Sequence, residues 1–331
     1  RPPPRSTLFP YTTLFRSENA PATQKDILIV RHFPGRFLSA CPGSDGMVCC
    51  NYAVFNLGYG CLFDCHYCYL QQFLNSPVQT LYGNLDDLFA ELDFKTRNQR
   101  VHFRIGTGEY TDSLALDPLT GLSRFLVNYF ATLPNATLEL KTKSSNVELL
   151  LDLDHRGRTV VAWSINPSFV IENLEPGTAS LEERLTAARQ VVDAGYQVAL
   201  HLDPMIYFEG WEEAYHRLLE ELFDRVPPDR VRWISLGTYR YAPGLKEKVQ
   251  ARGNGNLLTA PEMVQAKDGK YRYLKTIRSQ MYVSIRKKIE TIDPALFSYL
   301  CMETKRTWQD VVGNVPDSKK NLDLLFEGRR R

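Results

Sequence analysis

The residues with the clearest chemical meaning are three cysteines in a short loop. Cys61, Cys65 and Cys68 follow a C-x3-C-x2-C spacing, and Gly58 and Gly60 precede them. Thiolates at this spacing on one tight loop can hold three irons of a [4Fe–4S] cluster. The fourth iron then has no protein ligand, and an open coordination position is typical of a catalytic metal site. The spacing therefore predicts a cluster that binds a small substrate.

Two other interpretations of this loop stay open on spacing alone. A structural zinc site could use His66 or another cysteine as its fourth ligand, although zinc sites usually supply two ligand pairs separated by a spacer. A redox pair could use Cys65 and Cys68, but it would leave Cys61 without a role. We favour the iron–sulfur cluster, because it uses all three cysteines.

The other cysteines indicate where the protein works. The chain has seven cysteines, and six of them lie within 28 residues. A disulfide framework spreads its cysteines through a small secreted domain, so this odd, clustered set indicates a reducing compartment, the cytoplasm. Cys41, Cys49 and Cys50 could be ligands of a second metal site or a hydrogen donor. We favour small buried side chains for these three, because free cysteine is often buried.

The composition is that of an ordinary globular protein, with 44% hydrophobic and 24% charged residues among 331. No apolar run approaches the roughly 18 residues that a membrane helix needs. The start, RPPPRSTLFPYTTLFRS, reads as the in-frame translation of a sequencing-library adapter. We interpret residues 1–17 as an artefact without structure, with a Pro/Arg-rich tail as the alternative. Removing their three arginines leaves 37 basic against 38 acidic residues and changes the net charge from +2 to −1, so overall charge is no evidence for a nucleic-acid partner.

Short apolar runs alternate with helical patterns along the chain. Each run is rich in branched or aromatic residues and is followed by Gly, Pro, Asn, Asp or Ser, which predicts strands. The predicted strands are 26–30, 52–57, 101–105, 137–140, 160–165, 198–202 and 231–236. The predicted helices are 85–97, 119–132, 180–194 and 211–225. The third helix opens on a capping box formed by Ser180 and Glu183.

Six strand–helix repeats from 52 to 236 favour parallel strands with right-handed crossovers. We predict an α/β fold with a partial (β/α)6 TIM-like barrel over residues 51–238, since a closed barrel needs two more units. Residues 18–50 form an N-terminal extension in this division. Ligand chemistry is expected at the carboxyl ends of the strands, where His201 and Asp203 are further candidates, with core packing as their alternative.

The region from 239 to 331 has a different character. Between 240 and 290 there are twelve Lys and Arg residues against four acids, with tyrosines interleaved. Cations bind phosphates and rings stack on bases, so this composition suits a polyanion. An ordinary solvated helix face is the alternative. We predict a basic region that packs on the barrel, with a loop at 253–256 and helices near 277–290 and 294–305.

A family resemblance is carried by several spaced blocks. The cysteine loop after the first barrel strand, with an aromatic residue before its last cysteine, resembles the radical S-adenosylmethionine (SAM) superfamily. The blocks GCLFDCHYCYLQ, YGNLDDLF, TKSSNVELLLDLDHRGRT and WSINPSFVIENLEPGTASLEERLTAARQVVDAGY, and the segment from Pro204 to Trp211, resemble the spore photoproduct lyase family over roughly residues 50–305. The resemblance implies a [4Fe–4S] cluster that cleaves SAM reductively to a 5′-deoxyadenosyl radical, an external electron donor of the flavodoxin or ferredoxin type, and repair of thymine photolesions in DNA.

The resemblance also implies roles for single residues. Cys61, Cys65 and Cys68 match the cluster ligands. Two residues match SAM contacts: Lys143 matches a lysine that binds the SAM carboxylate, and Ser164 matches a serine.

The resemblance implies roles at three further positions. Asn166 lies beside the SAM-contacting serine and is a weaker candidate for the same ligand. Tyr67 and Tyr69 match two tyrosines that relay a hydrogen atom.

The second barrel strand ends in Gly106-Thr-Gly108-Glu109, which is similar to the GGE motif of the superfamily. In that motif the strand edge and the acid hold the SAM amino group. A buried ammonium needs a paired acceptor, which fits a glutamate at this place. An ordinary strand-terminal turn with an exposed glutamate is the alternative.

One position departs from the family. There, a cysteine just after this strand donates a hydrogen atom to the product radical. Aligned on Asp112, the matching stretch Glu109–Asp112 has no cysteine, and Thr111 stands where the family has a serine. We keep Thr111 as a candidate catalytic residue by position, but its O–H bond is much stronger than an S–H bond, so it cannot replace the thiol. Either another donor acts, such as Cys301 or the tyrosine pair, or the reaction differs.

Three functional hypotheses result. The first is a radical SAM lyase that repairs DNA photolesions. The second keeps SAM cleavage and changes the substrate, because the donor cysteine is missing. The third is a zinc-stabilised, non-catalytic protein that binds nucleic acid, which metal analysis would separate from the other two.

Overall fold

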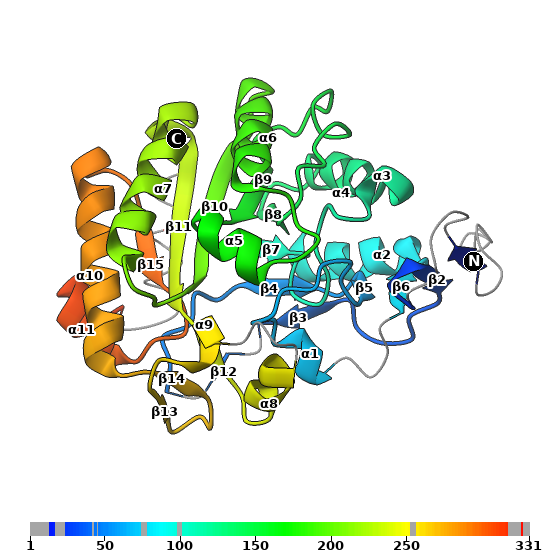
Figure 1. Cartoon of the computed structure of the whole chain (residues 1–331). Helices are drawn as coiled ribbons and strands as arrows, with labels where there is room; N and C mark the ends of the chain where they lie inside the picture. The colour runs from blue at the N-terminus through cyan, green and yellow to red at the C-terminus, as the bar shows by residue number, and fades with distance from the viewer. Residues whose placement is uncertain are drawn as a thin grey trace, which may run out of the picture.

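The centre of the molecule is an eight-stranded sheet that curls into a partial barrel (Figure 1). The computed structural model describes residues 13–16, 24–41, 43–44, 46–73, 78–97, 101–251, 256–316 and 326. The order of the strands in the sheet is β15-β11-β10-β9-β8-β7-β4-β3. Six consecutive members of this order pair in parallel: β4 (Ala53–Phe55), β7 (Phe103–Gly106), β8 (Ala136–Thr142), β9 (Thr159–Ser164), β10 (Gln197–Met205) and β11 (Val231–Thr238). The predicted partial (β/α)6 barrel is thereby confirmed.

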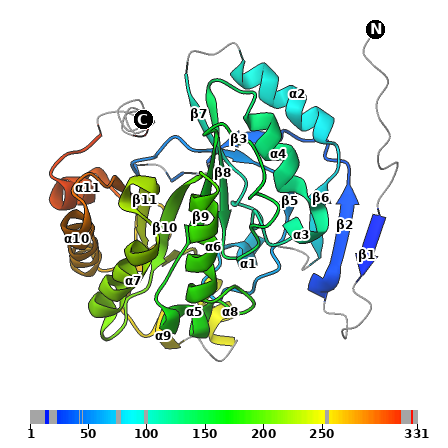
Figure 2. The same ribbon diagram turned by 90° about the horizontal axis from the view of Figure 1, so that it is seen from above.

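Helices cover the outer side of the curled sheet (Figure 2). They are α2 (Leu85–Thr96), α3 (Asp117–Thr120), α4 (Leu122–Phe130), α5 (Ser168–Leu174), α6 (Leu181–Asp193), α7 (Trp211–Arg225), α10 (Lys275–Ile292) and α11 (Lys305–Val312). The helix predicted over 119–132 is divided in two, because Gly121 adopts a left-handed φ of 59° between α3 and α4. None of the described helices combines the length and the apolarity that crossing a membrane requires.

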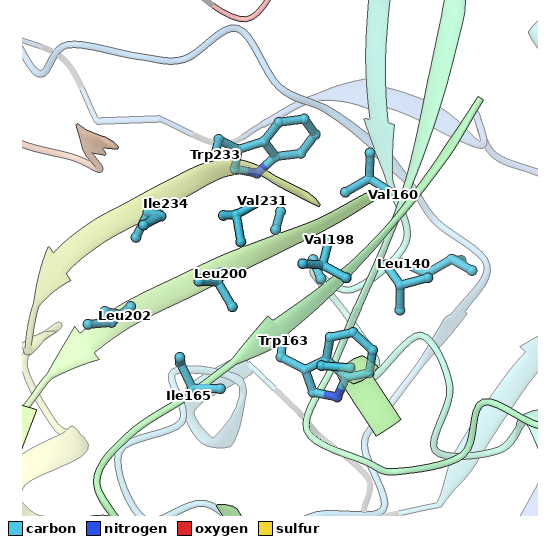
Figure 3. Close-up of a cluster of buried hydrophobic side chains, with 14 of the residues drawn as sticks. Leu140, Val160, Trp163, Ile165, Val198, Leu200, Leu202, Val231, Trp233 and Ile234 are labelled. Carbon is cyan, nitrogen blue, oxygen red and sulfur yellow. The ribbon is translucent and has the colours of Figure 1, made fainter. Parts of the chain in front are cut away.

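Apolar side chains of the barrel strands pack together in the core (Figure 3). Every residue of β9 and of β11 is buried, which is typical of parallel strands that are covered on both faces. The cluster in Figure 3 includes Trp163, Leu200 and Trp233, each at most 1% exposed. This burial explains why the strands could be recognised as short, continuous apolar runs.

The two edges of the barrel sheet are covered by strands outside the six predicted units. At one edge β3 (Leu38–Ala40) pairs antiparallel with β4, and at the other β15 (Ser298–Leu300) pairs parallel with β11. The helix predicted over 294–305 is therefore wrong. Helix α10 ends at Ile292, because the residue before Pro294 is disfavoured in helical conformation, and the following apolar stretch buries Tyr299 and Leu300 beside β11.

Two smaller sheets flank the barrel. One has the order β1-β2-β6-β5 and contains β1 (Thr13–Arg16), β2 (Ile27–Arg31), β6 (Gln79–Tyr82) and β5 (Gly58–Tyr59). The other has the order β12-β14-β13 and contains β12 (Arg240–Tyr241), β14 (Tyr271–Tyr273) and β13 (Met263–Gln265). The short helices α1 (Leu70–Phe73), α8 (Leu245–Ala251) and α9 (Asn256–Thr259) complete the described elements, with 3-10 turns at Gln24–Asp26 and Pro228–Arg230.

Two predictions fall largely outside the described residues. Of residues 1–17, the structure describes only Thr13–Arg16, which is a strand and not the structureless segment that we expected. Of the loop predicted at 253–256, only Asn256 is described, and it begins α9. The predicted strand at 26–30 and the predicted helix at 277–290 are confirmed as β2 and α10.

The capping box predicted for α6 is present. The Ser180 hydroxyl accepts a hydrogen bond from the Glu183 N–H at 3.3 Å, and the Glu183 carboxylate accepts one from the Ser180 N–H at 2.7 Å. The pair satisfies two N–H groups that helix geometry leaves without a partner. It thereby fixes the start of the helix that carries Arg184, a residue of the site described below.

Replacing Ser180 with alanine should therefore weaken the fold. We expect Ser180→Ala to lower the free energy of unfolding by about 1 kcal/mol, because the hydroxyl acceptor is lost, and urea denaturation followed by circular dichroism measures the change. Ser180→Thr keeps the hydroxyl and serves as the control. Equal stability of the alanine and threonine variants would show that the cap contributes nothing.

Candidate functional site

The three predicted cluster ligands lie in a loop at the carboxyl end of the barrel strands. The loop follows β5, and its backbone is held to the segment after α5, since the Asp64 N–H donates to the Pro176 carbonyl at 3.0 Å and the His66 N–H donates to the Leu174 carbonyl at 2.8 Å. The Cys68 N–H donates to the Cys65 carbonyl at 3.1 Å, which turns the chain back on itself. The loop is thus a fixed part of the barrel rim.

The thiols of this loop fit an iron–sulfur cluster. Burial raises the pKa of all three, that of Cys61 to about 12, and the charges of the neighbouring thiolates add to the rise for Cys61 and Cys65. Thiolates removed from water are stabilised by a cationic group bound to them, which iron provides. Within the described part of the chain, no three Cys, His, Asp or Glu side chains converge on one point as a single metal ion would need. A cluster does not need such convergence, because each thiolate binds a different iron.

Lys143 and Ser164, both predicted as SAM contacts, are brought together by neighbouring strands. Lys143 directly follows β8 and Ser164 ends β9, and these strands pair in parallel. The Lys143 ammonium donates to the Ser164 hydroxyl at 2.5 Å and lies 5.5 Å from the centre of the Tyr67 ring. The same ammonium is 3.5 Å from a carboxylate oxygen of Glu175.

Glu175 is the functional residue that sequence reasoning missed. Its carboxylate accepts hydrogen bonds from the Tyr67 hydroxyl, from the Asn166 amide at 3.0 Å and from the Arg184 guanidinium at 2.7 Å, and its side chain is completely buried. Burial by itself would raise the pKa of Glu175, but the charges of Lys143 and Arg184 outweigh it and lower the pKa to about 2. Its only sequence signal is its place in a block that resembles the family.

These groups form one connected site with a defined charge. Lys143 and Arg184 carry two positive charges and Glu175 carries one negative charge, so the cluster of side chains keeps one net positive charge at the rim. Arg184 also donates to the Ser164 carbonyl at 2.9 Å, and the Asn166 carbonyl oxygen accepts from the Tyr215 hydroxyl at 2.7 Å. A rigid site with one surplus positive charge and a lysine at its edge can bind a carboxylate.

The two tyrosines of the loop have different environments. The buried hydroxyl of Tyr67 is bound to the Glu175 carboxylate, whereas Tyr69 is 38% exposed and donates to the backbone carbonyl of Glu109 at 2.6 Å. Tyr67 therefore belongs to the lysine–glutamate site, and Tyr69 belongs to the end of β7. The sequence placed both tyrosines at the cysteine loop but did not predict that their environments differ.

The Gly106–Glu109 stretch has no space for larger residues. A Cβ at Gly106 would lie 1.3 Å from the Tyr52 hydroxyl oxygen, and a Cβ at Gly108 would lie 2.8 Å from the Lys141 carbonyl oxygen. The Glu109 carboxylate is 3.4 Å from the Lys141 ammonium. The acid predicted to hold an amino group is thus already beside an ammonium of the chain itself.

Thr111 lies in the same turn but makes only one weak contact. Its hydroxyl donates to the Asp112 carbonyl at 3.4 Å. The Asp112 carboxylate is half-buried and accepts from the Thr142 hydroxyl at 2.6 Å and from the Lys143 N–H at 2.8 Å. Burial raises the pKa of Asp112 although these hydrogen bonds lower it. Asp112 therefore anchors the turn to β8, which orients the residues before it.

Four cysteines outside the loop lie around the barrel. Cys41 follows β3, is half-buried, and donates its N–H to the Tyr52 carbonyl at 2.9 Å. Burial raises the pKa of its thiol to about 12, and the charge of Glu109 adds to the rise. The Cys41 thiol also contributes to the raised pKa of Tyr69. The Cys41 thiol thus lies within electrostatic range of Glu109 and Tyr69, whereas the Cys301 thiol is 4.0 Å from the Arg240 guanidinium.

The candidates His201 and Asp203 point into the barrel and have charged partners there. His201 Nε2 is 2.5 Å from a carboxylate oxygen of Glu139, and Asp203 is 3.1 Å from Arg240. Burial favours a higher pKa for Glu139, but the neighbouring His201 charge lowers it. Both side chains are therefore members of charged pairs inside the protein. The sequence pattern alone could not distinguish this role from core packing.

In this interior, four aromatic rings surround the guanidinium of Arg104. Its guanidinium is 3.8 Å from the centre of the Phe326 ring and 5.0 to 5.7 Å from three further rings. Those rings belong to Tyr52, Trp233 and Tyr299. A desolvated guanidinium over ring faces gains cation–π attraction, so the charge is accommodated without a directly paired acid.

Several basic residues of the 240–290 region are engaged inside the protein. Arg272 pairs with Asp268 at 2.6 Å, and Arg278 pairs with Glu303 at 2.9 Å. Tyr241 and Tyr271 stack on each other with ring centres 5.2 Å apart. Together with Arg240, these side chains stabilise the fold, so the number of basic residues in the region overstates the charge that it offers to a polyanion.

Comparisons with known proteins agree with this geometry. The family model described as spore photoproduct lyase matches residues 45–302. The spore photoproduct lyase of Geobacillus sp. (strain Y412MC61) is 37% identical over 169 residues, which cover 50% of this chain and 49% of that protein. The chain spans about half the length of the first curated relatives that it matches.

Solved structures extend the comparison. A spore photoproduct lyase complexed with dinucleoside spore photoproduct is 27% identical, with a TM-score of 0.74, and the match covers 84% of this chain and 83% of that one. A variant of spore photoproduct lyase with bound AdoMet and dinucleoside spore photoproduct is 28% identical, with a TM-score of 0.73 and the same coverage.

Glu175→Gln should reveal how much the buried ion pairs contribute to stability. The glutamine keeps the shape and removes the charge, leaving Lys143 and Arg184 without their counter-ion, so we expect a loss of about 3–5 kcal/mol at pH 7 by urea denaturation. The exposed Glu148 gives the control, Glu148→Gln, which should change stability by less than about 0.5 kcal/mol.

The same variant should change the pH dependence. A carboxyl whose folded-state pKa is lowered from 4.5 to about 2 stabilises the fold fully above pH 4.5 and loses that contribution as the pH falls towards 2. The stability difference between the wild type and Glu175→Gln should therefore shrink over that window. A difference that stays constant from pH 6 to pH 3 would contradict an ionised Glu175.

Proposed function

Because the chain belongs to the spore photoproduct lyase family, we propose that it is a radical SAM enzyme that repairs thymine photolesions in DNA. The main support is the placement of the three-cysteine loop beside Lys143, Ser164 and Glu175 at the rim of a partial barrel, within the segment that the family model matches. Structures of this family hold AdoMet (SAM) and a dinucleoside spore photoproduct in a fold that this chain shares.

We assign the cofactors to two parts of the rim. Cys61, Cys65 and Cys68 would hold a [4Fe–4S] cluster, and the thiol environment described above supports this donor set. When bound, the cluster and SAM supply the electron and the 5′-deoxyadenosyl radical that abstracts hydrogen from the substrate. An external donor of the flavodoxin or ferredoxin type would supply that electron, and a DNA substrate implies a cytoplasmic location.

The chain's own residues would orient SAM. Lys143 would bind its carboxylate, because the site around Glu175 keeps one positive charge in surplus. Ser164 accepts a hydrogen bond from Lys143 and so directs the ammonium. Glu109 would accept a hydrogen bond from the SAM amino group, which replaces its contact with Lys141, while Gly106 and Gly108 let the strand end approach closely. Asn166 contacts Glu175 and would act by positioning it.

The tyrosines would have separate tasks. Tyr67 donates a hydrogen bond to an ionised carboxylate, so a proton acceptor is already in place when its ring gives up an electron. Tyr69 lies at the barrel mouth beside Glu109 and Cys41. Thr111 would act only by shaping the turn, because its hydroxyl contacts a backbone carbonyl.

The hydrogen donor is the point at which this chain departs from its family, and Cys41 suits the role. The stretch Glu109–Asp112 has no cysteine where the family has its donor, and the charge of Glu109 acts on the Cys41 thiol. With a pKa raised to about 12, the thiol stays protonated at neutral pH and keeps its hydrogen. Its S–H bond would break and the hydrogen atom would pass to the product carbon radical. The thiyl left on sulfur would regain a hydrogen atom from Tyr69, and Tyr69 would regain one from the 5′-deoxyadenosine that holds the hydrogen taken from the substrate.

A second candidate function keeps the same chemistry with another substrate. The observation that favours it is the stretch Glu109–Asp112, which lacks the family's donor cysteine and instead carries a carboxylate paired with Lys141 at 3.4 Å. Lesion-containing DNA separates the two: deoxyadenosine formation without restored thymine would support the second function.

The cluster assignment is tested first by Cys65→Ala. Anaerobic reconstitution with iron and sulfide, followed by SAM and dithionite, should yield 5′-deoxyadenosine from the wild type and restored thymine when UV-treated spore-type DNA is added. We expect Cys65→Ala to lose the cluster absorbance and at least about a hundredfold in deoxyadenosine formation, because one iron loses its only protein ligand. Cys49→Ala is the matched control. Undiminished SAM cleavage by Cys65→Ala would refute the assignment, and zinc without iron in the wild type would favour the non-catalytic hypothesis.

The donor assignment is tested by Cys41→Ala in the same assay. Deoxyadenosine formation should persist, while the yield of restored thymine should fall about tenfold or more, because the product radical no longer finds a weak S–H bond. In deuterated water the wild type should place deuterium from the exchangeable thiol in the thymine. Cys301→Ala tests the alternative thiol. An unchanged thymine yield from Cys41→Ala would exclude Cys41 as the donor.

A further inference from the structure

A lysine from the N-terminal extension contacts the cysteine loop directly. Lys25 lies in the 3-10 turn Gln24–Asp26, outside the residues that the family model matches. Its ammonium donates to the Phe63 carbonyl at 2.6 Å and to the Leu62 carbonyl at 3.5 Å, and it pairs with the Asp64 carboxylate at 3.3 Å. All three acceptors lie between Cys61 and Cys65. One side chain thus binds the whole turn that separates two predicted cluster ligands.

A second side chain of the same flank completes this support. Gln79 belongs to β6, which pairs in parallel with β2, the strand that follows the turn containing Lys25. The Gln79 amide donates to the Cys61 carbonyl at 3.1 Å. Carbonyls 61, 62 and 63 are therefore all held by side chains from one small sheet and its entry turn. These contacts add to those that the Asp64 and His66 N–H groups make with the Pro176 and Leu174 carbonyls.

Lys25 places a positive charge beside the backbone between Cys61 and Cys65, because its ammonium lies 2.6 Å from the Phe63 carbonyl oxygen. The Lys25 side chain is 30% exposed and that of Asp64 is 46% exposed, so solvent screens the pair only in part. A cation at this place stabilises additional negative charge within the loop.

We propose that Lys25 is a positioning residue of the cluster site, which holds the Cys61–Cys65 turn and raises the reduction potential of the bound cluster. The inference rests on the proposed function, since it concerns the cluster that this function requires. A cluster that accepts an electron becomes more negative, and net charge and hydrogen bonding near the sulfurs set its potential. A nearby ammonium therefore favours the reduced state, which is the state that cleaves SAM.

The test is a redox titration of the reconstituted protein. Lys25→Met should lower the midpoint potential so that the ratio of reduced to oxidised cluster at a fixed potential falls about tenfold, equivalent to about 59 mV for one electron. Lys25→Arg keeps the charge and should stay close to the wild type. Asp64→Asn removes the opposite charge and should shift the potential the other way. Lys95→Met, on the exposed face of α2, is the matched control and should change nothing.

Electron paramagnetic resonance of the reduced cluster and iron and sulfide analysis accompany each titration. If the wild type takes up no cluster or forms no deoxyadenosine, the proposed function fails. If the wild type is fully loaded and neither Lys25→Met nor Asp64→Asn shifts the potential, the inference about Lys25 is overturned. If Lys25→Met does not retain a cluster, two other variants test the inference. A higher midpoint potential in Asp64→Asn and normal cluster loading in Lys25→Arg would support it, and the absence of both would overturn it.

Discussion

The ionised carboxylate of Glu175 is the group on which the rest of the rim depends. A charge that is removed completely from water is stable only if opposite charges and hydrogen bonds replace the lost hydration. Here Lys143 and Arg184 supply the charge, and Tyr67 and Asn166 supply further donors. The carboxylate thus joins the cysteine loop, the end of β8, the loop after β9 and helix α6 in one hydrogen-bonded unit. Each of these elements contributes a group to the proposed chemistry, and none could shift without breaking a contact to the same two oxygens.

The charged side chains of the barrel interior are likewise paired with side chains of opposite charge. Glu139 is paired with His201, Asp203 with Arg240, and Glu109 with Lys141. These pairs lie along the barrel strands and at their carboxyl ends, where a purely apolar filling would leave no polar surface for a charged substrate. Pairing stabilises the interior of the free protein. It also provides charged groups that could exchange their present partner for a group of the ligand. The contact between Glu109 and Lys141 is the place where such an exchange would admit the amino group of SAM.

The sequence predicted those parts of the molecule that depend on local pattern. Six apolar runs alternating with helices predicted the parallel barrel, and the cysteine spacing predicted the loop. The family resemblance named Lys143 and Ser164, and the structure brings them together because β8 and β9 pair in parallel. Pattern did not predict Glu175, because a glutamate between Leu174 and Pro176 has no spacing to distinguish it and acquires its role from Arg184 on the next helix. Nor did pattern predict β15, since the stretch around Tyr299 becomes a strand only by pairing with the free edge of β11. Lys25 was missed for a similar reason, because its contact spans nearly forty positions of the chain.

The late position of β15 has a consequence for how the chain is made. Strand β11 ends at Thr238, and its neighbour β15 begins at Ser298, so residues 239–297 leave the ribosome before the partner of β11 exists. During that interval a strand that is fully buried in the folded protein presents unpaired backbone groups at an open sheet edge, a surface that invites pairing with other nascent chains. The cysteine loop is translated much earlier, ahead of most of the barrel. Biogenesis of this protein therefore has a vulnerable interval in which a chaperone that shields sheet edges would raise the yield of folded protein more than one that assists loading of the metal centre.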